Sequence, residues 1–211
     1  MKLPAVLVAV LLALPAAAFS DPPPGYRLVD SVAASVNGEV IFLSEVVREA
    51  CYYRCGMVPG QAAGEISLAG VREKLIADAL VLQEQKKLGL GIVDNAAVAA
   101  AAAEVLSRRE KCALPCAKGV TGADARDLAT RRLLVRDFLS KRVGVFIEVN
   151  GEEVKQEIER LRSRGGADAE DLAEEKVRKS LYEQKAASEI RNWFTRATSK
   201  SRIVLSPMVE K

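Results

Sequence analysis

Residues 30–47 constrain the fold of this chain most, because they predict a strand, a tight turn, a second strand and the start of a helix. In residues 32–36, apolar side chains alternate with small or polar ones, which is typical of a half-buried strand. Asn37 and Gly38 can both adopt a positive φ, as a type I′ hairpin turn requires. Residues 40–42 then supply the returning strand.

A hairpin of two strands is only marginally stable in water, so a third strand is expected elsewhere in the chain. Ile203–Leu205, an apolar run bounded by breakers near the C-terminus, is the segment that we assign to it. Ser44 is expected to be the N-cap of the helix that follows the hairpin. The predicted fold class is mainly α, with a small antiparallel sheet formed by the N-terminal β-hairpin and the C-terminal strand.

The first 20 residues have the layout of a secretory signal peptide: a basic start, an apolar run over residues 3–14, and small residues that suit cleavage after Ala18 or Ser20. An uncleaved N-terminal anchor is the alternative, because the apolar run is nearly long enough to span a bilayer. Residues 21–28 are rich in proline and predict a stiff, extended leader. We therefore expect an exported, periplasmic protein without a membrane span in its mature part.

The remaining residues, 29–207, are expected to form a single helical domain. Aromatic residues are only 5% of the chain against 49% hydrophobic residues, a composition that favours a core built from helices. Capping residues and breakers predict further helices over 67–88, 94–109, 121–143 and 151–164, and a last long helix capped by Asp168. Residues 145–149 are expected to be extended, and residues 150–207 to return the chain to the hairpin. The formal net charge of +3 is too small to indicate nucleic-acid binding.

The four cysteines form two pairs with the same spacing, Cys51 with Cys55 and Cys112 with Cys116. Residues four apart share one face of a helix, so each pair can present both sulfurs to a neighbouring segment. In an oxidising compartment an even count at a repeated spacing favours disulfides. On antiparallel segments the favoured pairing is Cys51–Cys116 with Cys55–Cys112, although the sequence does not fix the connectivity. The outer bridge would close a loop of about 65 residues and stabilise the fold by about 4 kcal/mol.

Two other uses of the cysteines are disfavoured, and a third is excluded. A zinc site with four thiolates is disfavoured by export. A redox-active pair is disfavoured because the spacing is not Cys-x-x-Cys. Covalent haem in its usual motif needs a histidine, and the chain contains none. No metal or cofactor is therefore expected.

An apolar cluster accompanies the first cysteine pair. Tyr52, Tyr53, Met57 and Val58 can form an adaptable surface for client peptides, since aromatic and methionine side chains suit contacts of loose specificity. The alternative is a small core packed around the disulfides.

A basic run on the fourth predicted helix can attract acidic partners, but a solvated helix face is the simpler interpretation. The run consists of Arg131, Arg132, Arg136, Lys141 and Arg142. No catalytic group is predicted: without histidine, a Ser-His-Asp triad or a Cys-His nucleophile cannot form.

Several segments in order resemble the SurA N-terminal domain of exported chaperones and foldases. The segment Val32–Ile41 followed by a helix resembles the opening of that domain, and the helix Leu75–Gly89 followed by Ile92-Val93-Asp94 resembles its next signature. Val149–Val154 is similar to the start of a later helix, and Ile203–Leu205 to the segment that returns to the hairpin. The likeness covers roughly residues 28–207.

The resemblance implies a cradle that binds unfolded or partly folded exported chains, with outer-membrane proteins as the leading clients. One departure matters: SurA-like foldases usually carry a parvulin prolyl isomerase domain where this chain has only residues 162–168. Parvulin sites are built around histidines, so we expect an ATP-independent chaperone-like protein that is not an enzyme. The alternatives are a non-catalytic scaffold or assembly factor for one exported partner, and residual prolyl isomerase or thiol oxidoreductase activity.

Overall fold

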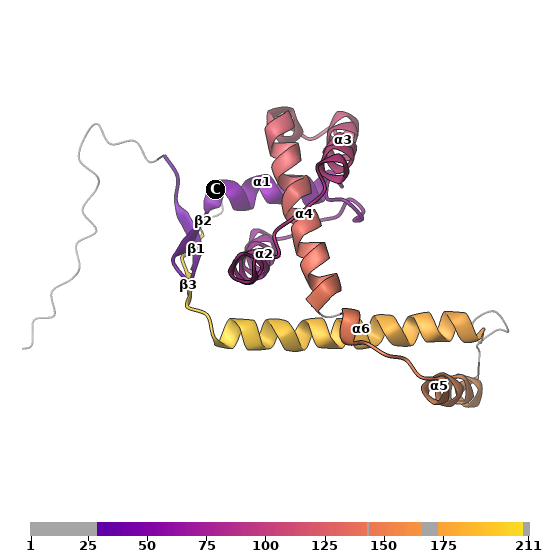
Figure 1. Ribbon diagram of the computed structural model, residues 1–211. Helices are drawn as coiled ribbons and strands as arrows, with labels where there is room; N and C mark the ends of the chain where they lie inside the picture. The colour runs from indigo at the N-terminus through magenta and orange to yellow at the C-terminus, as the bar shows by residue number, and fades with distance from the viewer. Residues whose placement is uncertain (1–28, 143, 166–172, 209–211) are drawn as a thin grey trace, which may run out of the picture.

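The computed structural model describes residues 29–142, 144–165 and 173–208 of the 211-residue chain. The predicted signal peptide, the leader and Asp168 lie outside the described residues. The described part is mainly helical with a small antiparallel sheet, so the predicted fold class is confirmed (Figure 1). In chain order the elements are β1 (Val32–Val36), β2 (Glu39–Phe42), α1 (Leu43–Arg54), α2 (Leu68–Leu88), α3 (Asn95–Lys111), the 3₁₀ helix η1 (Pro115–Gly119), α4 (Gly122–Arg142), the 3₁₀ helix η2 (Gly144–Phe146), α5 (Gly151–Arg164), α6 (Glu174–Ser199) and β3 (Ile203–Leu205).

The sheet joins the two ends of the described chain. Its strand order is β2-β1-β3, and both neighbours of β1 are antiparallel to it. Asn37 and Gly38 form the hairpin turn with φ values of 53° and 92°, as predicted. Asn37 also fixes the third strand, because its N–H donates to the carbonyl of Arg202 and its Oδ1 accepts the N–H of Arg202, both at 2.8 Å. The predicted third strand, Ile203–Leu205, is therefore confirmed.

The start of α1 differs from the prediction. Its N-cap is Phe42 rather than Ser44, because β2 runs into the helix without a linker. The Glu45 carboxylate accepts the Phe42 N–H at 2.7 Å. Ser44 instead donates its hydroxyl and its N–H to the Asp30 carboxylate. The hydroxyl hydrogen bond from Ser44 is the main reason that the pKa of Asp30 lies below its ordinary value.

The other helix boundaries follow the predicted caps. Ser67 Oγ accepts the Gly70 N–H at 3.1 Å at the start of α2, and Gly89 ends that helix with φ 68°. Asp94 caps α3 through two backbone N–H groups, and Asn150 forms a capping box with Glu153 at the start of α5. Residues 145–149 are predicted to be extended, but the start of this segment belongs to η2. There the N–H of residue 147 donates to the carbonyl of residue 144 at 3.2 Å.

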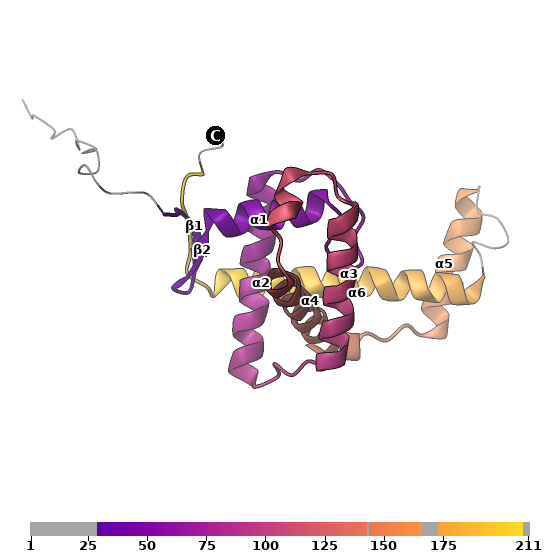
Figure 2. The same cartoon turned by 90° about the horizontal axis from the view of Figure 1, so that it is seen from above.

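The helices form a core and an arm (Figures 1 and 2). The core consists of the sheet and α1 to α4, and the C-terminal half of α6 packs against it. The arm is α5 together with the N-terminal half of α6, residues 174–186, and it extends beyond the core. Val154 and Val177 are buried in the arm, and Lys185 Nζ lies 2.6 Å from Glu153 Oε1. Each helix of the described ranges is too short or too polar to cross a membrane.

Candidate binding groove

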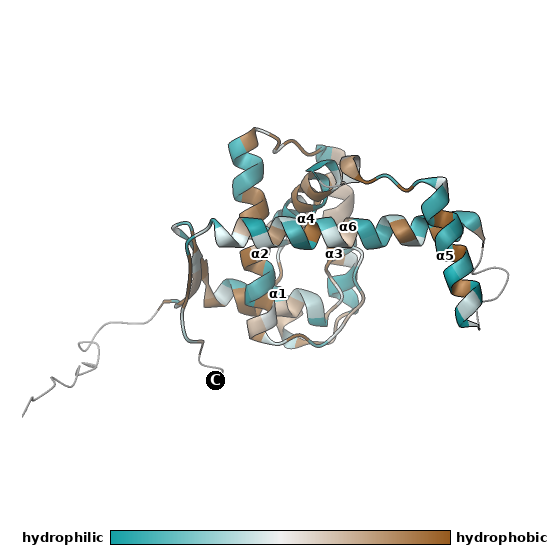
Figure 3. Cartoon of the chain, turned by 90° about the horizontal axis from the view of Figure 1, so that it is seen from below, coloured by the Kyte–Doolittle hydropathy of each residue, from teal (hydrophilic) through white to brown (hydrophobic). Residues whose placement is uncertain are grey.

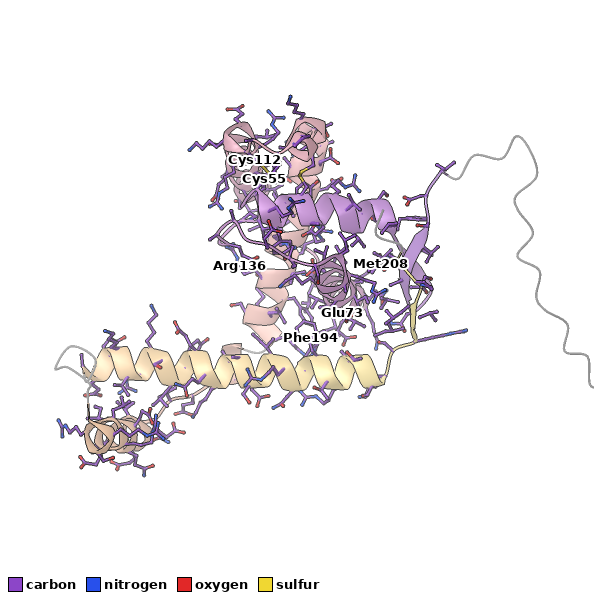
Figure 4. The ribbon with its side chains drawn as sticks, turned by 180° about the vertical axis from the view of Figure 1, so that it is seen from behind. Cys55, Glu73, Cys112, Arg136, Phe194 and Met208 are labelled. Atoms are coloured by element: carbon purple, nitrogen blue, oxygen red, sulfur yellow. A yellow bond between two sulfur atoms is a disulfide. The ribbon has the colours of Figure 1, made fainter. Side chains whose placement is uncertain are left out.

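Two disulfides join α1 to the segment between α3 and α4. They are Cys51–Cys116 and Cys55–Cys112, the pairing favoured from the sequence, with Cα atoms 6.1 and 5.4 Å apart. Figure 4 shows Cys55 and Cys112 together at the end of the molecule opposite α6. The sulfurs of Cys51, Cys55 and Cys116 lie within 4.8 Å of one another, but in the disulfide form they offer no thiolate to a metal ion.

The apolar cluster beside the first cysteine pair is part of the core. Tyr52, Tyr53, Met57 and Val58 are all buried, so the prediction that they form an exposed client-binding surface is wrong. Of the four, Val58 alone reaches the wall of the groove described below, and it is 1% exposed. The four residues pack around the disulfides, as in the alternative interpretation, because α1 and the following turn are held against η1 and α3. Burial raises the pKa of the Tyr52 hydroxyl to about 12.

A buried charge cluster connects α1, α2 and α4. Glu49 is only 1% exposed, and its carboxylate accepts hydrogen bonds from both Arg131 and Arg132. Arg132 also lies 3.1 Å from Asp78 Oδ2 and donates to the Tyr53 hydroxyl at 3.0 Å. Burial raises the pKa of Asp78, an effect that the two nearby arginines partly oppose. The cluster orients α4 against the other two helices.

The basic run on α4 is therefore not one solvated face. Arg131 and Arg132 turn toward the core, where Glu49 and Asp78 pair with them, and for these two residues the prediction is wrong. The remaining members of the run, Arg136, Lys141 and Arg142, are exposed as predicted.

An open groove of about 760 Å³ lies between α3, α4 and α6. Figure 1 shows α4 running from the disulfide end of the core down to α6. Both the core and the helix that carries the arm contribute to its walls. The lining residues are Val58, Pro59, Gln61, Ala97, Ala100, Ala101, Glu104, Ala129, Arg132, Leu133, Val135, Arg136, Leu139, Ser140, Gly144, Tyr182, Ala186 and Ile190.

Small side chains on α3 leave the groove open. Ala97 and Ala100 face it with a single methyl group each and are exposed to solvent. On the opposite walls, Leu133 of α4 and Ile190 of α6 are half-buried, so part of their apolar surface is available. Tyr182 adds an exposed aromatic ring. A groove with these walls can accept apolar side chains without selecting one shape.

The polar groups of the groove are few, and most are already paired. Glu104 Oε1 lies 2.5 Å from Arg108, and Arg132 is held by the buried carboxylates. Arg136 differs, because within the described ranges no carboxylate pairs with it (Figure 4). Its guanidinium lies at the rim, where it can meet a carboxylate or a backbone carbonyl of a bound segment.

One sequence feature is a partial sign of this groove. The alanine-rich run 96–103 is a strong helix former with little volume to pack, which predicts a helix but not the space beside it. The walls that α4 and α6 contribute consist of residues about 30 and 80 positions further along the chain. Figure 3 shows that α6 and α5 carry apolar turns among hydrophilic ones, a pattern that does not reveal what each turn faces.

No protein-family model and no curated protein matches this chain. The resemblance to the SurA N-terminal domain stays a prediction. The groove and the core and arm that border it are the features from which a function can be argued.

Proposed function

We propose that this chain is an exported, ATP-independent chaperone-like protein that binds unfolded or partly folded exported polypeptides. Outer-membrane proteins are the leading clients. The observation that carries the proposal is the open apolar groove between α3, α4 and α6, which is wide enough for several side chains of an extended segment. Burial of client side chains against Leu133, Tyr182 and Ile190 would supply the binding energy.

Two further features support the assignment to the periplasm. Paired disulfides are typical of oxidising compartments, and the predicted signal peptide would deliver the chain there. The resemblance to the SurA N-terminal domain implies the same compartment and the same class of client.

The proposal assigns no catalytic step to the groove. The chain has no histidine, and the hydroxyl groups in the groove, those of Ser140 and Tyr182, form no hydrogen bond with a carboxylate of the described residues. Arg132 and Arg136 can orient a bound carboxylate or carbonyl but cannot act as bases at neutral pH. Binding alone is the activity that these residues support.

The test compares two substitutions one residue apart on α3. Ala100 and Ala99 are both exposed, but only Ala100 faces the groove. Ala100→Arg would place a long cation in the groove, whereas Ala99→Arg would add the same charge and the same helix propensity outside it. The chain is produced from Asp21 onward, because residues 29–208 supply the whole described core.

The assay measures aggregation of a denatured outer-membrane β-barrel protein on dilution from urea. The unsubstituted chain and Ala99→Arg are expected to suppress aggregation at a stoichiometric ratio, and Ala100→Arg to need about tenfold more protein, since losing one well-buried contact costs about 1.4 kcal/mol. The proposal is wrong if the unsubstituted chain has no effect on aggregation. A single folded partner that co-purifies at a fixed ratio would instead favour the scaffold alternative.

A further inference from the structure

Exposed large apolar side chains gather in two areas of the described structure. One area is the sheet and its surroundings, with Val29, Val32, Val40, Phe42, Val47, Val204 and Leu205. The other is the edge at which α2 and α4 end, with Leu88, Leu90, Ile92 and Phe146. Tyr182, which is also exposed, belongs to the groove. We call the second area the helix-end edge.

Figure 2 shows the helix-end edge at one side of the molecule. The α2–α3 connection and the short turn that follows α4 lie along the same side there. A surface hollow places the connection beside α4, because Ile92 and Val93 line it together with Arg136 and Ser140. The turn after α4 lines another hollow, in which Phe146 lies with Arg142 and Trp193.

The apolar tips at this edge are held outward by the fold. Gln85 is buried, and its side-chain amide donates to the carbonyls of Leu90, at 3.4 Å, and of Leu134 in α4, at 3.2 Å. This double contact fixes the connection to α4, with the Leu90 side chain 41% exposed and that of Ile92 84% exposed. Phe146, in the turn after α4, is 76% exposed.

Charges of both signs border these apolar tips, and the carboxylates are Asp94 and Asp137 near Ile92 and Glu148 near Phe146. Lys86 and Lys87 occupy the last turn of α2, and Lys141 and Arg142 the last turn of α4. Lys87 and Lys141 are paired with carboxylates of their own helices, at 3.8 and 3.0 Å. For Lys86 and Arg142, by contrast, the described residues provide no carboxylate partner.

The helix dipole explains a cation near a helix C-terminus, but it does not explain exposed isoleucine and phenylalanine beside it. Apolar tips that project from loops between cations are the arrangement by which a protein lies on a lipid surface: the tips enter the interface and the cations meet anionic headgroups. We propose that the helix-end edge docks on a membrane surface that contains anionic phospholipid. This contact is peripheral, and its apolar tips Leu88, Leu90, Ile92 and Phe146 are not among the lining residues of the groove.

The experiment measures co-flotation of the chain from Asp21 with lipid vesicles. One set is pure phosphatidylcholine, and the other contains about one third phosphatidylglycerol, which gives the surface a negative potential. The edge variant carries Ile92→Ser and Phe146→Ser. The matched control carries Val40→Ser and Val204→Ser, which remove two exposed apolar side chains from the sheet.

The unsubstituted chain and the control are expected to float with the anionic vesicles and to remain unbound with the neutral ones. The edge variant is expected to bind at least about tenfold more weakly, because it loses most of the apolar area that can enter the interface. A charge variant, Lys86→Ala with Arg142→Ala, is expected to weaken binding about tenfold as well.

Three results would overturn the proposal: no binding to anionic vesicles at low salt, equal binding to both vesicle types, or equal binding by the edge variant and the control. Self-association that the edge variant abolishes, without vesicle binding, would show instead that the edge is an interface between copies of this chain. Sedimentation velocity without lipid identifies that outcome.

Discussion

The core and the arm are both helical, but they are held together by different interactions. In the core, buried apolar side chains from the sheet and four helices surround two disulfides and a buried charge cluster. In the arm, Val154 and Val177 are the buried residues of α5 and α6 within the described ranges. The arm otherwise depends on polar contacts such as Lys185 with Glu153 and with the carbonyl of Glu148.

The groove therefore lies between walls that differ in how many buried contacts hold them. Its α3 and α4 walls belong to the disulfide-closed core, whereas its α6 wall continues into the arm. Trp193 anchors α6 to α4 through an edge-to-face contact with Phe138, with ring centroids 5.3 Å apart. Regions with few buried contacts open more readily than a packed core, so we expect the α6 wall to move more readily than the α3 and α4 walls.

The largest expected effect comes from the disulfides. Replacing either pair by serine should cost about 2–3 kcal/mol of unfolding free energy, because the other bridge still closes nearly the same loop. Replacing both pairs should cost about 6 kcal/mol, at least twice either single loss. Urea denaturation measures all three values. If the double replacement cost no more than one single replacement, the bridges would not be what closes the core.

The second-largest expected effect compares the stability lost with a buried ion pair and the stability lost with an exposed one. Glu49→Leu leaves Arg131 and Arg132 without their main partner and should cost about 3 kcal/mol. Glu174→Leu, in the arm, removes an exposed pair with Arg178 and should cost less than about 1 kcal/mol. Thermal unfolding of the two variants checks the difference, and equal losses would contradict it.

Two valine truncations compare the apolar contacts of the regions. Val105 and Val154 are both fully buried, the first in the core and the second in the arm. Val105→Ala should lower the global unfolding free energy by about 2 kcal/mol. Val154→Ala should leave it nearly unchanged but speed hydrogen exchange of α5 amides, because the arm opens locally. Global destabilisation of similar size by both would show one cooperative unit.

The smallest effect is the response of the arm to acid. The Lys185 hydrogen bond and the Asn150 backbone N–H hold the pKa of Glu153 below its ordinary value of 4.5. The contribution of ionised Glu153 to the stability of the arm is therefore fully present above pH 4.5. It is lost as the pH falls through the lower pKa of the folded state. Hydrogen exchange of α5 should accelerate in that window. Glu153→Gln keeps the capping geometry and should remove the pH response.

Much of the fold could be predicted because its signals are local. Contacts between neighbouring residues fix the hairpin turn and several helix ends. These are the turn at Asn37-Gly38, the caps Ser67, Asp94 and Asn150, and the terminator Gly89. Even the third strand followed from a local argument, since a lone hairpin needs a partner. The prediction of Ser44 as the N-cap of α1 was wrong, because Ser44 instead contacts Asp30 across the hairpin and Phe42 is the cap.

The site could not be predicted in the same way, because it depends on which faces meet. Arg131, Arg132 and Arg136 are alike in the sequence, yet the first two pair with the buried Glu49, whereas Arg136 lines the groove without pairing with Glu49. Tyr52 is an aromatic residue of the kind that is common on binding surfaces, yet it lies in the core. A single sequence carries no record of such pairings between distant segments.

The central claim is that clients occupy the groove between α3, α4 and α6. The most direct measurement is photo-crosslinking of a denatured outer-membrane protein to a chain with a photoreactive residue at Ala100 or at Ala99. We predict strong crosslinking from position 100 and little from position 99, because these exposed neighbours differ in whether they face the groove. Equal crosslinking from both positions, or crosslinking from position 99 alone, would contradict the claim.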